Sequence, residues 1–226
     1  MIQRLAKFNK MPITELVFPR LNRDPVLLQG LKNVLPPAAK ATFSGVPGLL
    51  SYYHGKVVKA ERITEGADAE HSGLVLALEW DHISSFNTFW ASENFASFRG
   101  AMKPYLLGPV APELFGSDKQ SQSGGTTTDK YTQYIKVNGI KEPDAEVEGA
   151  WQALIVELKR QESPSFSAWG VQDTTAFAGM LGWGSVEESE AAMALPSVKA
   201  CLEKMAGYGP VSSYLMELEK QSIVQD

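Results

Sequence analysis

The sequence contains one long pattern twice, and this duplication limits the folds that the chain can adopt. In the first half an apolar run ends at Trp80, and the tripeptide Gly108-Pro109-Val110 follows after a helical stretch. In the second half an apolar run ends at Trp183, and a second Gly-Pro-Val begins at Gly209. A repeat of this length is a whole small domain rather than one unit of a solenoid. The chain is therefore expected to fold as two copies of one domain.

A polar segment separates the two copies. Residues 117–129 carry no large apolar side chain, so this segment has nothing to bury and is typical of a flexible linker. We expect a first unit at residues 11–116, the linker at 117–129, and a second unit at 130–218.

The first unit alternates strand and helix patterns. Asp24, a good N-cap residue, precedes a proline and then apolar residues at helical spacing, which predicts a helix. Ser84 or Ser85 marks the start of a second helical stretch, and Ser92 marks another helix start. A polar loop is expected at about residues 59–72. Strands are expected at 13–21, 48–55, 73–81 and 109–115.

The second unit repeats this order. A helix is expected at 144–160, and Ser185 caps a second one that is broken at Pro196. Strands are expected at 130–137, 165–172, 175–183 and 211–218. Each unit is thus β-α-β-β-α-β, the ferredoxin-like arrangement of the α+β class.

A single ferredoxin-like sheet covers only one of its faces with helices. The strand at 73–81 is mostly apolar on both faces, so both faces need cover. The tandem copy supplies that cover at high effective concentration.

The stretch from Trp80 through WASENFASFRGAMKPY resembles the antibiotic-biosynthesis-monooxygenase and stress-responsive dimeric α/β-barrel superfamily. The resemblance covers about residues 11–115 and 130–218. It implies two tandem ferredoxin-like units whose four-stranded sheets pair as an intramolecular α/β barrel, with helices outside. That superfamily includes cofactor-free oxygenases, cyclases, decarboxylases, isomerases, haem-binding members and members without known activity, so the fold alone does not select a reaction.

Composition excludes several other classes. The chain has 226 residues, of which 44% are hydrophobic, and a net charge of −5, which argues against nucleic-acid and anionic-membrane partners. Cys201 is its only cysteine, and no apolar run is long enough to cross a bilayer. We expect a cytoplasmic protein whose partner is a small apolar molecule, and we consider a homodimer.

The histidines supply the sharpest functional clue, because His54, His71 and His82 all lie in the first unit. That unit is therefore expected to be the active one, with the second mainly structural. His54 shares a strand face with Tyr52, so His54 is a candidate base and Tyr52 a candidate acid or orienting group. His71 and His82 are candidate secondary catalytic contacts, and each histidine could instead be a local or surface residue. Their spacing fits no metal-site pattern, so no metal is expected.

The first unit is also rich in aromatic residues, which are most simply core residues but could line an apolar pocket. The histidine-bearing run of the olivetolic-acid-type cyclases has no counterpart at residues 91–95 or 194–198, so that mechanism is not implied. The candidate substrate-binding residues are Tyr53, Trp80, Trp90, Asn94, Phe95 and Arg99.

These features favour a cofactor-independent enzyme acting on a polyketide- or terpenoid-like molecule. Its reaction would be an acid/base-assisted cyclisation, isomerisation, dehydration or oxygenation. The alternatives are a non-catalytic small-molecule-binding or stress-response barrel protein, and a haem-handling protein.

Overall fold

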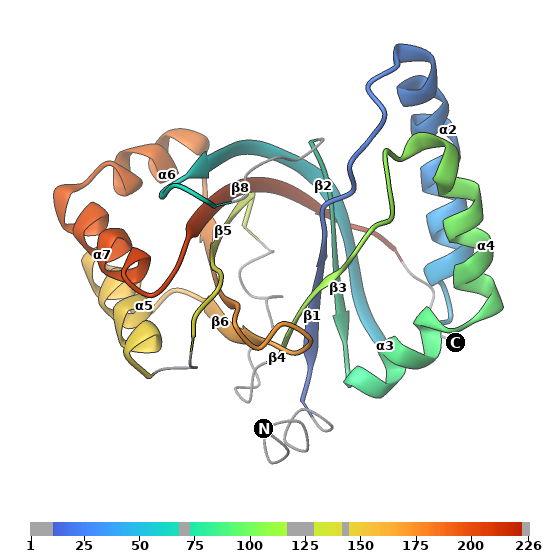
Figure 1. Ribbon diagram of the computed structural model, residues 1–226. Helices are drawn as coiled ribbons and strands as arrows, with labels where there is room; N and C mark the ends of the chain where they lie inside the picture. Colours follow the sequence, from blue (N-terminus) through green and yellow to red (C-terminus); the bar gives the residue numbers. More distant parts are fainter. Residues whose placement is uncertain (1–10, 68–72, 117–128, 142–144, 223–226) are drawn as a thin grey trace.

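The computed structural model describes residues 11–67, 73–116, 129–141 and 145–222. In these residues the strands form one closed barrel, and the helices lie outside it in two groups on opposite sides (Figure 1). The elements of the first unit are β1 (Ile13–Val17), α2 (Pro25–Phe43), β2 (Leu49–Arg62), β3 (Leu74–Trp80), α3 (Ile83–Trp90), α4 (Glu93–Met102), the 3-10 helix η1 (Lys103–Tyr105) and β4 (Glu113–Gly116). Those of the second unit are β5 (Tyr131–Val137), α5 (Ala145–Glu157), β6 (Ser165–Gly170), β7 (Phe177–Trp183), α6 (Val186–Met193), α7 (Pro196–Ala206) and β8 (Val211–Lys220).

Each unit contributes an antiparallel four-stranded sheet with the ferredoxin-like strand order. The orders are β4-β1-β3-β2 and β8-β5-β7-β6, and the two sheets close the barrel through β2–β8 and β4–β6. The β2–β8 seam runs from Tyr53 opposite Lys220 to Arg62 opposite Ser212, whereas β4 and β6 pair only at their ends. The expected fold, two tandem ferredoxin-like units pairing as an intramolecular barrel, is confirmed.

The expected loop at 59–72 is wrong over its first four residues, because β2 continues to Arg62. These residues pair with the other copy, with Lys59 opposite Leu215 and Arg62 opposite Ser212. A polar stretch therefore becomes a strand because of a partner far away in the sequence. Residues 68–72 and 117–128 lie outside the described residues, so the unit boundaries and the linker stay predictions.

Side-chain caps explain where two helices of the first unit begin. The Asp24 carboxylate accepts hydrogen bonds from two backbone N–H groups at 2.8 and 3.3 Å, and the Ser92 hydroxyl accepts one at 3.1 Å, so both expected caps are confirmed. The expected start at Ser84 or Ser85 is wrong, because α3 begins at Ile83. The structure has α3 following directly on β3 without a side-chain cap.

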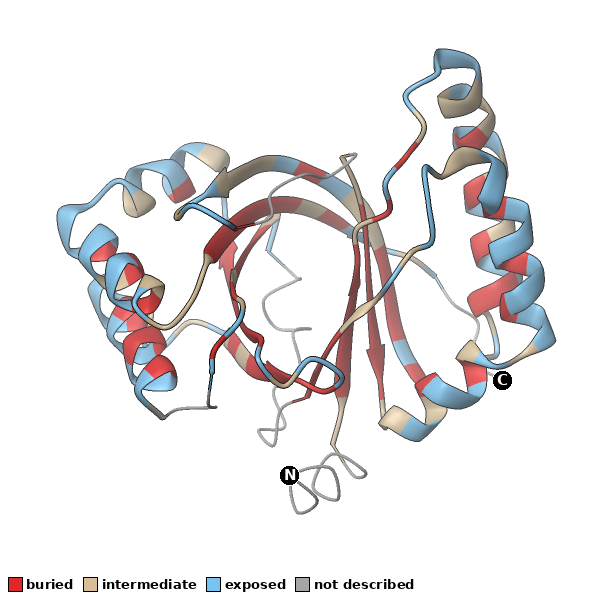
Figure 2. Ribbon diagram, viewed as in Figure 1, coloured by how far each residue is buried: buried red, intermediate tan, exposed pale blue. Residues whose placement is uncertain are grey.

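Three apolar clusters hold the fold together. One lies between each sheet and its helices, and the third fills the inside of the barrel. Figure 2 shows that the helix faces turned toward the barrel are buried and the outer faces are exposed. Among the described helices, none combines the length and apolar character that a bilayer crossing requires. Cytoplasmic location and a homodimer stay predictions.

Candidate active site

The first unit holds an apolar cavity of about 690 Å³ between its sheet and its helices. The floor is aliphatic and comes from β3, with Leu74, Leu76 and Leu78. The opposite wall comes from α2, α3 and α4 and is largely aromatic. Its aromatic members are Phe43, Phe89, Trp90, Phe95 and Phe98. Such a space suits a small apolar molecule.

Glu15 is the one acidic side chain that lines this cavity, and it is buried. It lies on β1 opposite Leu78, with the apolar residues Ile13 and Val17 on the same face. Trp80 Nε1 donates a hydrogen bond of 2.8 Å to Glu15 Oε2. Burial raises the pKa of Glu15 from 4.5 to about 7, and the Trp80 hydrogen bond partly opposes this rise. Near neutral pH the group can therefore both accept and donate a proton.

Two basic residues complete the charged lining of the cavity, and both are exposed. Arg99 and Lys103 come from α4 and the η1 turn that follows it. The Arg99 guanidinium lies over two rings of the aromatic wall, 5.3 Å from the Trp90 centroid and 5.1 Å from the Phe95 centroid. The cavity thus has a buried acid and a basic rim.

The segment that lines the cavity between η1 and β4 departs from expectation. A strand was expected at 109–115, but β4 covers only Glu113–Gly116 and residues 106–112 are not part of it. The β1–β4 ladder ends at Leu16 opposite Glu113. The corresponding β5–β8 ladder of the second copy continues to Val137 opposite Val211. The earlier separation of the first-copy strands leaves residues 106–112 to form one side of the cavity.

Of the expected substrate-binding residues, the structure brings Trp90, Phe95 and Arg99 together along the cavity. Trp80 does not line it but holds Glu15, as described above. Asn94 lies outside the lining and donates a 3.0 Å hydrogen bond to the Thr42 carbonyl, which ties α4 to the end of α2.

Three residues that were expected to be catalytic, His54, Tyr52 and His82, do not line this cavity. His54 lies on β2 beside a surface cleft of about 830 Å³, which Tyr53 also lines. Tyr52 is buried against Phe43, and burial raises the pKa of its phenol well above the ordinary value. Their roles stay predictions.

His82 lies outside the cavity lining. His82 Nδ1 lies 3.2 Å from Asp81 Oδ2, and both side chains are partly exposed. His71 lies outside the described residues. In the part of the chain that the structure describes, no group of three or more His, Cys, Asp or Glu side chains could hold a metal ion.

The second copy provides an internal comparison for Glu15. Trp80 pairs with Ile13 in the first copy, and Trp183 pairs with Tyr131 in the second. Glu15 lies two positions after Ile13 and Gln133 lies two positions after Tyr131, so Gln133 is the equivalent of Glu15. A neutral amide therefore replaces the acid.

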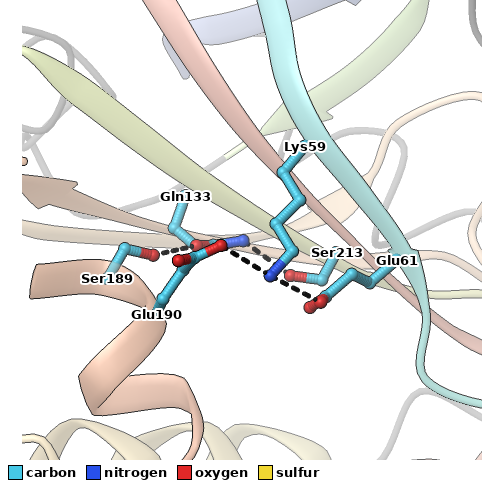
Figure 3. Close-up of polar contacts among 6 residues, drawn as sticks. All are labelled: Lys59, Glu61, Gln133, Ser189, Glu190 and Ser213. Atoms are coloured by element: carbon cyan, nitrogen blue, oxygen red, sulfur yellow. Dashed lines mark hydrogen bonds and ion pairs between the residues drawn. The ribbon is translucent and has the colours of Figure 1, made fainter. Parts of the chain in front are cut away.

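Gln133 is held by neighbours that the acid lacks. Its Nε2 donates to Ser213 Oγ at 2.6 Å, and its Oε1 accepts from Ser189 Oγ at 2.8 Å, as Figure 3 shows. In the same view Lys59 lies 2.9 Å from both Glu61 and Glu190. Both ends of the Gln133 amide therefore make structural hydrogen bonds.

The space over the second sheet is filled by a tryptophan. Gly179 stands where the first copy has Leu76, since the two residues face Ile135 and Val17 in equivalent pairs. The ring of Trp151, which is fully buried, lies so close that a Cβ at Gly179 would overlap it. The helix thus packs directly on the sheet.

The residues that correspond to the cavity wall also differ between the copies, in side-chain size and in charge. Helices α3 and α6 have equal lengths and start at equivalent distances from Trp80 and Trp183, and α4 and α7 follow at the same spacing. By this alignment the second copy has smaller or uncharged residues throughout. Phe89, Trp90, Phe95, Phe98, Arg99 and Lys103 correspond to Ala192, Met193, Val198, Cys201, Leu202 and Ala206.

Sequence reasoning missed Glu15, although one signal for it was present. Alternation along 13–17 places this acid on the same strand face as Ile13 and Val17. An acid on an otherwise apolar face is unusual unless it is paired or functional. Only the pairing of β1 with β3 shows that Trp80 faces it.

Comparison with solved structures agrees with this architecture. A candidate monooxygenase from Fusobacterium nucleatum superposes with a TM-score of 0.61 at 7% identity, covering 96% of each chain. An anthrone oxidase-like protein gives 0.62 at 14% identity, covering 94% of this chain and 93% of the other. A candidate monooxygenase from Lactobacillus acidophilus gives 0.51 at 14%, covering 96% and 100%. No protein-family model and no curated protein matches the sequence.

The molecule thus has an α/β-barrel fold like that of these solved structures, with both ferredoxin-like units carried by one chain. At these identities the likeness establishes the fold. The chemistry has to be argued from the site.

Proposed function

We propose that the chain is a cofactor-independent enzyme in which Glu15 takes a proton from a small apolar substrate bound in the first unit. The observation that carries this proposal is a buried carboxyl group with a pKa of about 7 on the wall of an apolar cavity. A base is most effective when its pKa lies near the working pH. Low polarity around the substrate also strengthens every electrostatic contact within the site.

The substrate would carry an acidic C–H or O–H group, as an enolisable ketone or a phenol does. Glu15 takes the proton, and the electron pair left behind is delocalised into the carbonyl or the ring. Return of the proton to a different atom gives isomerisation. Reaction with molecular oxygen converts an activated CH2 to C=O, with release of one water for each O2 consumed.

The names of the structural neighbours favour the oxygen branch. Two are called candidate monooxygenases and a third is called anthrone oxidase-like. An anthrone has the required chemistry, since it is an aromatic ketone with an activated methylene. Cyclisation and dehydration would begin with the same proton transfer.

Divergence of the two copies supports activity in the first unit. Gln133 cannot act as a base at neutral pH, and Trp151 fills the space over the second sheet. We therefore assign the second unit a mainly structural role. We assign the base to Glu15 rather than His54, because Glu15 lines the cavity.

The test uses anthrone as the substrate. Purified protein is mixed with anthrone under air, and anthraquinone absorbance and oxygen uptake are followed against heat-denatured protein. We expect Glu15→Gln to lose at least 100-fold in rate, which is the usual weight of a general base. Glu203→Gln, which changes an exposed acid of α7, should keep the wild-type rate.

A parallel His54→Ala variant separates the two candidate bases. Equal rates for wild type and Glu15→Gln, together with a loss in His54→Ala, would transfer the assignment to His54. Binding without turnover in all proteins would favour the non-catalytic alternative.

A further inference from the structure

We infer that the molecule bound in the first-unit cavity carries an anionic group, a carboxylate or an acidic phenolate, which is held at the rim by Arg99 and Lys103. This inference rests on the proposed function and specifies the substrate class as an apolar acid. Its apolar body would lie between the β3 floor and the aromatic wall, and its charge would face solvent.

The charges along the cavity are separated. Glu15 is buried, whereas Arg99 and Lys103 are exposed, and these three are the charged residues of the lining. In the described part of the chain, no carboxylate forms an ion pair with either basic residue. Two cations near one opening, in a protein with a net charge of −5, are arranged to attract an anion.

Arg99 is also held in position. Its guanidinium carbon lies 5.3 Å from the Trp90 centroid and 5.1 Å from the Phe95 centroid, which is cation–π range for both rings. The guanidinium carries five N–H donors in a planar fork, which suits a two-point contact with a carboxylate. An arginine fixed in this way loses little conformational freedom when it binds an anion.

The second copy lacks this arrangement. By the helix alignment, Leu202 and Ala206 stand in place of Arg99 and Lys103, in the unit where Gln133 replaces Glu15. Both cations are therefore absent from the unit in which Gln133 replaces the acid and Trp151 packs against the sheet. If the two basic residues served only solubility, there would be no reason for them to be present in the unit that has the acid and absent from the unit that lacks it.

The acid and the cations then have different tasks. Glu15, when ionised, repels a carboxylate, so the anionic end of the molecule is favoured at the rim. This orientation places the opposite, apolar end next to Glu15. The rim would thus decide which end of the molecule meets the base.

The test compares two probes of equal shape, 2-anthracenecarboxylate and 2-anthracenecarboxamide, by fluorescence titration at pH 8. We expect wild-type protein to bind the carboxylate at least about tenfold more tightly, the weight of one charge-assisted hydrogen bond. Raising NaCl from about 0.05 to about 0.5 M should weaken only the carboxylate complex, because salt screens exposed charges.

Variants locate the effect. The double variant Arg99→Gln/Lys103→Gln should bind both probes equally, and its unchanged affinity for the amide shows that the cavity is intact. Lys32→Gln removes one positive charge from an exposed position on α2 outside the lining and should keep the preference. Glu15→Gln should not weaken the preference, because it removes the charge that repels the carboxylate.

Three results would overturn the inference: equal binding of both probes by wild type, a preference that persists in the double variant, or binding of neither probe. Equal binding removes the anionic substrate class and leaves the role of Glu15 untouched, since binding is measured without turnover. Binding of neither probe would count against the proposed function as well.

Discussion

The buried acid should make the protein less stable as the pH rises, and replacing it should remove this effect. Glu15 has a folded-state pKa of about 7, against 4.5 for a glutamate that is exposed to water in the unfolded chain. Below about pH 4.5 it is protonated in both states and costs nothing. As the pH rises through 7, the folded protein must either hold a carboxylate in apolar surroundings or keep a proton that the unfolded chain releases.

The size of the effect follows from the shift. A difference of this size in pKa corresponds to about 3 kcal/mol of unfolding free energy, present at pH 5 and largely lost by pH 8. Glu15→Gln keeps an acceptor for Trp80 Nε1 and carries no charge. We therefore expect the variant to be more stable than wild type at pH 8, by up to about 3 kcal/mol, and close to wild type at pH 5.

The assay is urea unfolding followed by tryptophan fluorescence at intervals from pH 5 to pH 8.5. The difference between the two proteins should grow with pH, with its steepest change between pH 5 and 7. Glu203→Gln is the matched control, because the same change at an exposed acid should leave the pH dependence of wild type intact. Parallel curves for wild type and Glu15→Gln would refute the reasoning, since they would show that Glu15 is not held in apolar surroundings.

Two further variants probe the neighbours of these features. Trp80→Phe removes the donor that lowers the pKa of Glu15, so the pH-dependent loss of stability should continue to a higher pH than in wild type in the same urea assay. Gly179→Ala forces a Cβ into the ring of Trp151 and should cost about 1–3 kcal/mol in unfolding free energy, whereas Gly149→Ala, where a Cβ meets nothing within 4 Å, should not destabilise. Loss of stability in both glycine variants alike would contradict the tight packing of Trp151.

Much of the fold was predictable because its signals are local. The apolar run before Trp80 and the one before Trp183 each give a central strand, and caps such as Ser92 fix helix starts. What could not be predicted depends on contacts between the copies. The last residues of β2 are polar and become a strand only because β8 pairs with them.

The candidate site was only partly predictable for the same reason. Trp90, Phe95 and Arg99 lie on one helical stretch, so helical spacing was enough to group them. Glu15 lies on a strand far from them in the sequence, and its pairing partner Leu78 and its donor Trp80 both come from β3. A histidine was the expected base because the ordinary pKa of histidine is near neutral. In the structure, burial raises the pKa of the Glu15 carboxyl group to about 7.

Fusion of the two units also explains how they could come to differ. In a barrel made of two identical chains, every substitution appears in both units, so a cavity in one is a cavity in both. Here Trp151 closes the second unit while Glu15 and its cavity occupy the first. A buried acid and an unfilled space both lower stability. The second unit has a buried core of its own and is joined to the first along the β2–β8 seam, so its packing contributes to the stability of the same molecule.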